Sequence, residues 1–164
     1  MRILSANVNR SGAVHATVLQ LAYEQGVDVL FVQEPWLHGE EARRLPKHHP
    51  AFNTLSPTQQ WTDRPRVMTY ARKDRLHLQV TADQSFPEHP DVMAVNVFGL
   101  RPAAVRLFNV YNGARGNTRE GEAAARILQY GNLDQPEIYA GDFNMHHEFW
   151  SLTPPNGPCS SAAA

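Results

Sequence analysis

Apolar and polar positions along the first part of the chain predict a strand, a helix and a second strand. Residues 2–8 alternate apolar or small residues with polar ones, which is typical of a buried strand. Ser11 precedes apolar residues at helical spacing and is a suitable helix cap, and Gly26 ends that helix. Residues 27–32 form an apolar run too short for a helix and predict a fully buried strand. These elements predict a βαβ unit whose two strands end at the same edge of one sheet.

The middle of the chain changes to a loop and then to a series of strands. Residues 38–63 lose all periodicity and contain prolines, which predicts a long loop with a short strand near Phe52. Further strands are predicted at residues 66–71, 76–80, 92–98 and 105–111. The last of these runs is strongly apolar.

A second helix and a final strand complete the pattern. Residues 118–129 predict a helix that Thr118 caps. The side chains expected to face inward from it are Ala124, Ile127 and Leu128. Residues 137–140 predict a short strand that leads directly into Gly141-Asp142-Phe143-Asn144. The order of elements predicts an α+β fold with mixed sheets.

Composition and charge narrow the class of protein only a little. The 164 residues are enough for one domain, and 15 Lys and Arg against 16 Asp and Glu leave a net charge of −1. This balance lacks the basic excess of a dedicated DNA-binding protein, although a local basic groove is compatible with it. The single cysteine, Cys159, has no disulfide partner and no zinc-ligand spacing, which favours an intracellular, reducing compartment. Residues 1–9 do not resemble a secretory signal and no apolar run has membrane-spanning length, so no membrane partner is expected.

Polar side chains stand at the ends of several predicted strands. These residues are Asn7, Glu34, Tyr111, Asn112, Asp142 and Asn144. In layered folds of strands and helices, ligands bind at the carboxyl ends of strands, because loops converge there while the sheet holds them rigidly. We therefore expect these side chains to form one site.

Two carboxylates in such a site indicate a bound cation. Glu34 and Asp142 would repel each other unless a cation lay between or near them. Carboxylate and amide oxygens suit a hard cation, so Mg²⁺ or Mn²⁺ is expected. Such an ion polarises a phosphoryl oxygen and stabilises a leaving oxygen. The Asn amides and the Tyr111 hydroxyl can donate to phosphate oxygens as negative charge develops in the transition state.

Each candidate also has a purely structural interpretation. Asn7 alone is typical of a turn at a strand end, and Glu34 of a solvated loop. Tyr111 can equally be a core ring with its hydroxyl at the surface. Asp142 is the best single candidate, because Gly141 before it permits a close approach of backbones.

Other charged and ligand-type residues have weaker signals. The lysines and arginines in residues 64–75 are interpreted as an exposed basic strand face, with a phosphate groove as the alternative. His146 and His147 are neighbours in sequence and do not face each other on a helix, so they are interpreted as helix-start or packing residues.

Four strings of residues resemble, in order, the motifs of the endonuclease/exonuclease/phosphatase superfamily. They are Ser5-Ala6-Asn7, Val32-Gln33-Glu34-Pro35-Trp36, Asn109-Val110-Tyr111-Asn112 and Gly141-Asp142-Phe143-Asn144. The second string, and the fourth extended through Met145-His146-His147 to Trp150, resemble most closely the endonuclease domain of LINE-type (non-LTR) retrotransposons. Residues 66–73 are similar to a strand of those domains, and the resemblance extends from Arg2 to about Trp150.

This resemblance implies a DNase I-like fold, a four-layer α/β/β/α sandwich, with a magnesium-dependent site for cutting DNA. It implies that Glu34 is the main metal ligand, with Asn7 beside it. It also implies that Asp142 positions or activates the attacking water and that Asn144 holds the phosphate or the water. Tyr111 is similar to the residue whose hydroxyl contacts the phosphate.

The resemblance stops after Trp150. Family members continue with further strands, a Ser-Asp motif and a final His paired with an Asp, and nothing here is similar to them. We therefore expect residues 1–150 to form a C-terminally truncated domain and residues 151–164 to be a disordered tail.

Three hypotheses about function follow from these observations. The first is a magnesium-dependent endonuclease that nicks DNA as part of a retrotransposon-derived protein, for which the nucleus is the implied compartment. The second is a non-catalytic remnant of such a domain. The third is another branch of the superfamily, such as an abasic-site endonuclease or a phosphatase. The strings that contain Glu34 and Trp150 favour the LINE-type branch over the third hypothesis.

Overall fold

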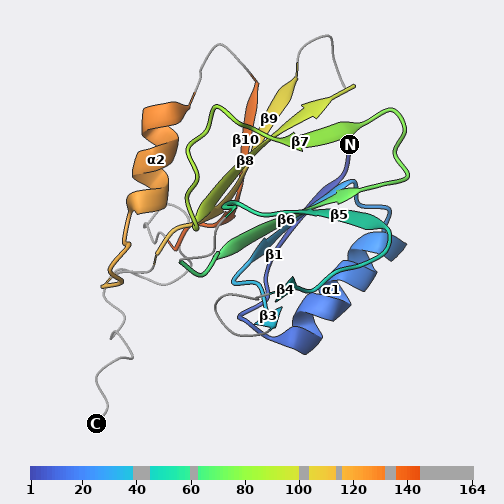
Figure 1. The fold of residues 1–164 in the computed structure, drawn as a ribbon, viewed down its shortest axis with the longest axis horizontal. Coiled ribbons are helices and arrows are strands. Elements are labelled where there is room, and N and C mark those ends of the chain that lie inside the picture. The colour runs from blue at the N-terminus through green and yellow to red at the C-terminus, as the bar shows by residue number, and fades with distance from the viewer. Residues whose placement is uncertain (39–44, 60–62, 100–103, 114–115, 132–135, 145–164) are drawn as a thin grey trace, which may run out of the picture.

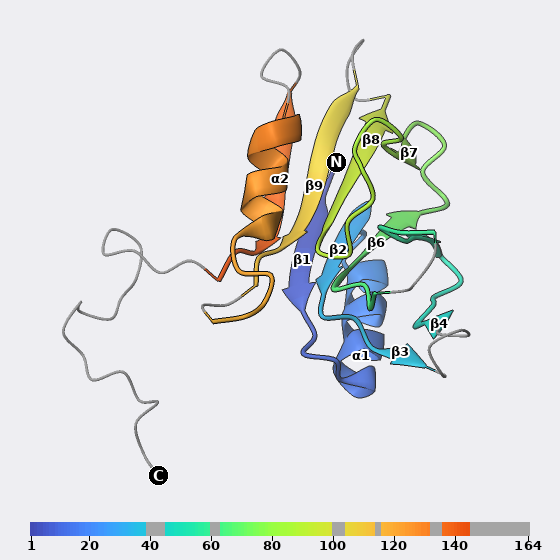
Figure 2. The ribbon, with the colours of Figure 1, turned by 60° about the vertical axis from the view of Figure 1, so that its left-hand side comes forward.

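The fold consists of two β-sheets packed face to face, with one helix on the outer face of each (Figures 1 and 2). The computed structural model describes residues 1–38, 45–59, 63–99, 104–113, 116–131 and 136–144. The predicted α+β class and its arrangement as an α/β/β/α sandwich are confirmed.

The first sheet has the strand order β1-β2-β6-β5. Its strands are β1 (Ile3–Asn7), β2 (Val29–Gln33), β6 (Val67–Arg72) and β5 (Phe52–Leu55), and helix α1 (Gly12–Glu24) connects the first two. β1 and β2 are parallel, as a βαβ unit requires, whereas β6 is antiparallel to both of its neighbours. Two short strands, β3 (Leu37–His38) and β4 (Leu45–Pro46), pair with each other beside this sheet.

The second sheet has the strand order β10-β9-β8-β7. Its strands are β10 (Glu137–Asp142), β9 (Val105–Tyr111), β8 (Val92–Phe98) and β7 (Gln79–Ala82), with helix α2 (Glu122–Tyr130) before β10. β9 and β10 are parallel, so both end at the same edge of this sheet. Each sheet therefore has one parallel pair, and the carboxyl ends of the two pairs supply the polar residues discussed below.

The alternation of side chains along the central strands explains the layers. In β2, Leu30 and Val32 pack with α1, whereas Val29 and Phe31 face the second sheet. In β9, the even positions pack toward α2 and the odd ones toward the first sheet. Burying one such side chain contributes roughly 1.5–3 kcal/mol, so apolar residues on both faces favour a strand covered on both sides.

A buried asparagine joins the two sheets. The amide nitrogen of Asn109 in β9 donates to the Met68 carbonyl at 3.0 Å and lies 3.3 Å from the Thr69 hydroxyl. Its oxygen accepts from Gln33 Nε2 at 2.7 Å. A buried polar group is stable only when it is hydrogen-bonded, so this network permits one relative position of the sheets.

The second helix departs from its prediction. Ser11 caps α1 as predicted, through a bond from the Val14 amide to its hydroxyl, but Thr118 does not cap α2. That helix begins at Glu122 behind Gly121, whose φ of 75° breaks the helical path. Ile127 packs against the core as predicted, but the fully buried side chain is Ala123 and Leu128 is 87% exposed, so the predicted inward face is only partly correct.

Two strand predictions also differ from the structure. Residues 76–80 were expected to form a strand, but β7 begins at Gln79, because the Leu78 amide closes a turn on the Arg75 carbonyl and Leu76 is exposed. β4 and the second residue of β3, His38, lie inside residues 38–63, which were expected to form a loop. In the described part of the chain, no helix is long and apolar enough to span a membrane.

Candidate active site

The carboxyl ends of β1, β2, β9 and β10 meet at one end of the sandwich. Asn7 ends β1, Glu34 follows β2, and Tyr111 pairs with Asp142 at the last position of β9 and β10. Asn7 Nδ2 donates to Asp142 Oδ2 at 2.8 Å and lies 3.4 Å from Glu34 Oε1. One amide thus links a carboxylate from each sheet.

Glu34 is held by its backbone as well as by its side chain. Its amide donates to the Arg66 carbonyl and its carbonyl accepts from the Arg10 amide, both at 2.8 Å. Its side chain is 16% exposed, and its carboxylate forms an ion pair with Arg10 Nε at 3.2 Å. These contacts fix the direction of the carboxylate and leave part of it accessible to a ligand.

Tyr111 is buried beside Glu34. Burial raises the pKa of Tyr111, and the negative charge and hydrogen bond of Glu34 raise it further. The phenol therefore stays protonated and remains a hydrogen-bond donor. The Arg66 guanidinium lies 4.6 Å from the centre of the Tyr111 ring, a cation–π contact that fixes the ring.

The Gly-Asp-Phe-Asn string ends β10 with a tight local structure. Asp142 Oδ1 accepts from the Asn144 amide at 3.1 Å, and Asn144 Nδ2 donates to the Asn112 carbonyl at 2.7 Å. A Cβ on Gly141 would lie 1.9 Å from the Val110 carbonyl oxygen, so only glycine permits this pairing. The interpretation of Gly141 as a residue of close approach is thereby confirmed, and Asn144 joins the ends of β9 and β10.

Backbone strain is concentrated around the site. Among the described residues, the non-glycine residues with positive φ are Asn9, Arg10, Glu34 and Asn144. All of them lie in the loops that follow β1, β2 and β10. Left-handed backbone at such residues is uncommon and is often found where a structure positions functional groups.

The donor set fits a hard divalent cation. Glu34 and Asp142 present carboxylate oxygens to the same point, and their mutual repulsion would be relieved by a cation there. The Asn7 oxygen accepts from the Asn9 amide at 2.8 Å, so the nitrogen of this amide faces the carboxylates. Ligation by Asn7 would require its amide to turn over and give up that bond.

A second group of metal-ligand residue types fits less well. Ligand atoms of His89, Asp91 and Glu122 lie within 4.8 Å of one another. However, His89 Nδ1 accepts from the Asp91 amide at 3.2 Å, so the neutral ring carries its proton on Nε2, the atom that faces Glu122. Asp91 is bound through both oxygens by Arg66. We therefore assign this group to structure.

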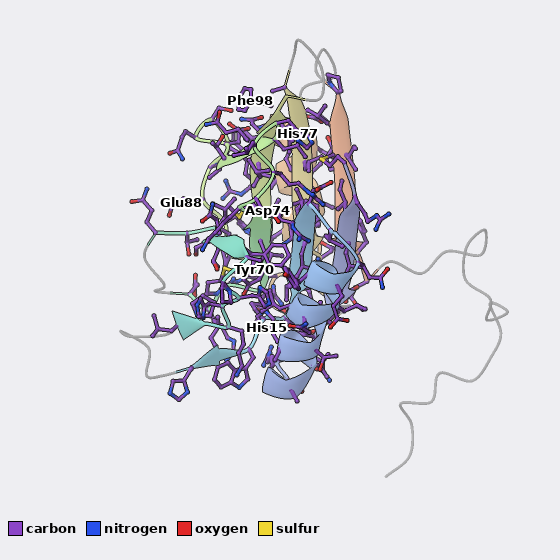
Figure 3. All side chains as sticks on the ribbon, turned by 90° about the vertical axis from the view of Figure 1, so that its right-hand side faces the viewer. His15, Tyr70, Asp74, His77, Glu88 and Phe98 are labelled. Atoms are coloured by element: carbon purple, nitrogen blue, oxygen red, sulfur yellow. The ribbon has the colours of Figure 1, made fainter. Side chains whose placement is uncertain are left out.

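A buried histidine supports the loop that carries Glu34. His15 of α1 faces Tyr70 of β6 (Figure 3), with 3.0 Å between Nε2 and the hydroxyl. His15 Nδ1 accepts from the Trp36 amide at 3.2 Å, and the Tyr70 hydroxyl donates to the Lys47 carbonyl at 2.7 Å. Burial lowers the pKa of His15 to about 4, so the ring is neutral and joins the helix to this loop.

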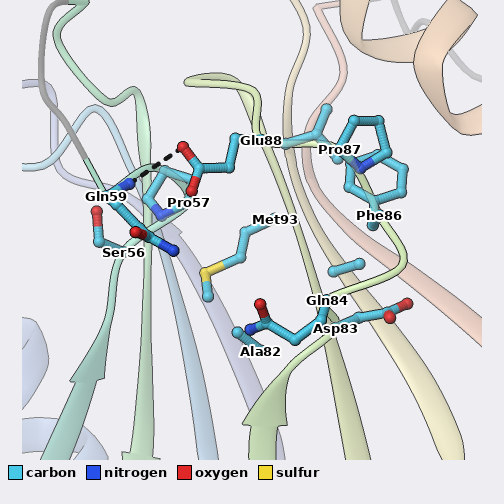
Figure 4. Close-up of a pocket in the computed structure, with 12 residues that line it drawn as sticks. Ser56, Pro57, Gln59, Ala82, Asp83, Gln84, Phe86, Pro87, Glu88 and Met93 are labelled. Carbon is cyan, nitrogen blue, oxygen red and sulfur yellow. Dashed lines mark hydrogen bonds between the residues drawn. The ribbon is translucent and has the colours of Figure 1, made fainter.

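Two hollows open at this end of the sheets. The first, about 310 Å³, lies between the β5 and β7 edges and contains Met93 and Glu88, whose carboxylate accepts from the Gln59 amide (Figure 4). Asp83 also lines it but is paired with Arg106 at 2.6 Å, so Glu88 is the acid that disfavours a phosphate ligand there. The second hollow, about 300 Å³, is lined by arginines that include Arg10 and Arg66.

Several residues of the site were not predicted. Arg66 was interpreted as part of an exposed strand face, but it is buried, because Asp91 binds it through two hydrogen bonds. The signal that could have indicated Arg10 is its place three residues after Asn7, in the same loop. His146, His147, Trp150 and the tail lie outside the described residues.

Comparison with known proteins agrees with this geometry. The sequence matches the endonuclease/exonuclease/phosphatase family over residues 4–158. The chain belongs to this family. Members of the family generally depend on a divalent metal, in agreement with the donor set of Glu34 and Asp142. No curated protein sequence matches the chain.

Solved structures of two kinds share the family fold. The endonuclease domain of TRAS1, a telomere-specific non-LTR retrotransposon, is 17% identical with a TM-score of 0.66, and the match covers 91% of this chain. A humanized D. rerio TDP2 is 14% identical with a TM-score of 0.58 over 88% of the chain, and D. rerio TDP2 complexed with a single-strand DNA product is 13% identical with 0.51 over 88%. The chain spans 61–63% of the length of these structures.

Proposed function

We propose that this chain belongs to a metal-dependent phosphodiesterase that nicks DNA, encoded within a retrotransposon-derived protein. The observation that carries the proposal is the meeting of Glu34 and Asp142, one from each sheet, on the amide of Asn7. Membership in the family and the likeness to the TRAS1 endonuclease domain support it.

The chain's own residues have distinct roles in this proposal. Asp142 accepts a proton from the attacking water, and its orientation depends on the bond from the Asn144 amide. Tyr111, protonated and fixed by Arg66, donates to a phosphate oxygen as negative charge develops. Asn144 holds the end of β10 beside β9 and thereby positions Asp142.

The metal is proposed to be Mg²⁺, with Mn²⁺ as its substitute. Glu34 would hold it, with Asn7 as a second ligand after the amide turns over. When bound, the ion supplies charge stabilisation to the phosphoryl and leaving oxygens. Binding at Glu34 would also release Arg10 from its ion pair.

A nicking assay tests the proposal. Purified chain is incubated with supercoiled plasmid and Mg²⁺, beside Asp142→Asn and Glu34→Gln, which keep the shape of each side chain. We expect conversion to the open circle by the wild type and a loss of 10²-fold or more in each variant, of the order found for catalytic acids and bases.

Asp74→Asn is the matched control, because Asp74 is exposed and lies beyond β6, at the end of the sheet opposite Glu34. It should nick as the wild type does. Absence of nicking by the folded wild type would favour a non-catalytic remnant. Equal activity in Asp142→Asn would contradict the assignment of the site.

A further inference from the structure

The second hollow is basic, although the chain as a whole has no excess of basic residues. Four arginines line it, namely Arg10, Arg64, Arg66 and Arg119, and the single acid among its described lining residues is Asp63. The chain as a whole has a net charge of −1. The positive charge is therefore gathered beside the carboxylate pair, where a negatively charged ligand would meet it.

This hollow begins one side chain away from the proposed site. Arg10 lines it and contacts the Glu34 carboxylate at 3.2 Å, and Arg66 lines it and covers the Tyr111 ring. A phosphate at Glu34 and a group in the hollow would thus be neighbours. Successive phosphates of a nucleic acid strand are neighbours in the same way.

The arginines differ in how firmly they are held. Arg66 is fixed by buried Asp91. Arg119 lies 3.6 Å from Asp91 but pairs more closely, at 3.0 Å, with Asp63, whose side chain is 63% exposed, and Arg10 is itself 56% exposed. Exposed ion pairs contribute little, so a phosphate can replace the exposed Asp63 carboxylate at Arg119, and the largely exposed Arg10 can turn toward it.

We propose that the hollow binds the backbone phosphate of DNA adjacent to the phosphodiester that is cut, with Arg119 and Arg10 as its direct contacts. The planar guanidinium binds two phosphate oxygens at once, which suits this position better than a point charge would. The acidic hollow near Met93 lacks such donors among its described lining residues. The inference rests on the proposed function, since it places the cut bond at Glu34 and Asp142.

Binding of a short DNA duplex, measured by fluorescence anisotropy in Mg²⁺ over a range of salt, tests the contact. Asp142→Asn serves as the background, so that no DNA is cut. Adding Arg119→Gln should reduce the slope of log affinity against log salt by about 0.9, the effect of one phosphate contact. Arg10→Gln should do the same, which provides a second variant if Arg119→Gln folds poorly.

Lys73→Gln is the charge-matched control. Lys73 is exposed just after β6, at the end of the sheet away from Glu34, and its loss should leave the slope unchanged. A second arm uses duplexes with one neutral methylphosphonate linkage near the cut. At the linkage next to the cut, neutralisation should weaken binding to the background protein but cause no further loss in Arg119→Gln.

The outcomes separate this inference from the proposed function. If the wild type nicks plasmid but Arg119→Gln and Arg10→Gln keep the full slope, the hollow is not the phosphate subsite. The same conclusion follows if no methylphosphonate position depends on Arg119. If the slope depends on Arg119 but the wild type does not nick, the phosphate contact stands and the catalytic proposal fails. If the chain binds no DNA, both fail.

Discussion

Replacement of Asp91 by Asn should destabilise the protein strongly, because it leaves a buried guanidinium without its partner. The Asp91 side chain is fully buried and that of Arg66 is 11% exposed. Arg66 Nε donates to Oδ1 at 2.7 Å, Nη2 donates to Oδ2, and Arg119 approaches Oδ1 at 3.6 Å. An asparagine would present an NH₂ group to one of these donors and would remove the charge that compensates Arg66.

The size of the effect follows from this geometry. Breaking a buried ion pair by removal of one partner costs about 3–5 kcal/mol. With a urea m-value of about 2 kcal/mol/M, the midpoint of unfolding should fall by about 1.5–2.5 M. This is a large share of the roughly 5–15 kcal/mol that stabilises a domain.

Urea unfolding followed by tryptophan fluorescence measures the change, with Asp74→Asn as the control. The Arg72–Asp74 pair has the same chemistry at 2.7 Å, but the Asp74 side chain is 59% exposed. The urea midpoint of Asp74→Asn should therefore equal that of the wild type. The double variant Arg66→Met with Asp91→Leu should recover part of the loss, because it removes both charges. A midpoint for Asp91→Asn within about 0.3 M of the wild type, less than 1 kcal/mol at that m-value, would refute the reasoning.

Two further predictions concern a backbone contact and a titration. Gly141→Ala should destabilise the protein by clearly more than 1 kcal/mol in urea unfolding, since its Cβ would meet the Val110 carbonyl oxygen at 1.9 Å. Gly116→Ala, also at positive φ but with open space around it, is the control, and an equal loss would show that strain in φ alone is responsible. Burial lowers the pKa of His15 from 6.5 to about 4, so the unfolded chain takes up a proton at this position before the folded protein does. The free energy of unfolding should therefore fall as pH falls from 6.5 to 4, by roughly 1.36 kcal/mol per pH unit and about 3 kcal/mol in all. The unfolding free energy of the wild type relative to His15→Gln should therefore shrink between pH 6.5 and pH 4, and a constant difference would mean that His15 is not the titrating group.

Much of the fold could be predicted because its central strands are buried on both faces. The runs that became β8 and β9 were predicted with their observed bounds, since Asp91 and Gly99 flank the first and Asn112 follows the second. Helix α2 was misjudged because Thr118 has the chemistry of a cap, whereas the backbone enters the helix through Gly121. Local preference does not reveal which residue takes positive φ.

In the candidate site, the residues at strand ends could be predicted, but the buried ion pair beside them could not. Asn7, Glu34 and Asp142 stand at strand ends, and parallel pairing brings such ends together, so their convergence followed from topology. The roles of Arg66 and Asp91 could not be inferred, because each depends on a partner 25 residues away in another element. A lone arginine in a sequence does not show whether it is paired and buried.

The division of the site between two sheets also determines when the site can form during synthesis of the chain. Asn7 and Asp142 are 135 residues apart, and Glu34 belongs to the sheet that is synthesised first. A nascent chain therefore carries Asn7 and Glu34 but lacks Asp142 until β10 has left the ribosome and docked beside β9. Under the proposed function, the site stays incomplete in a partly folded chain, so DNA nicking would report on completed tertiary structure.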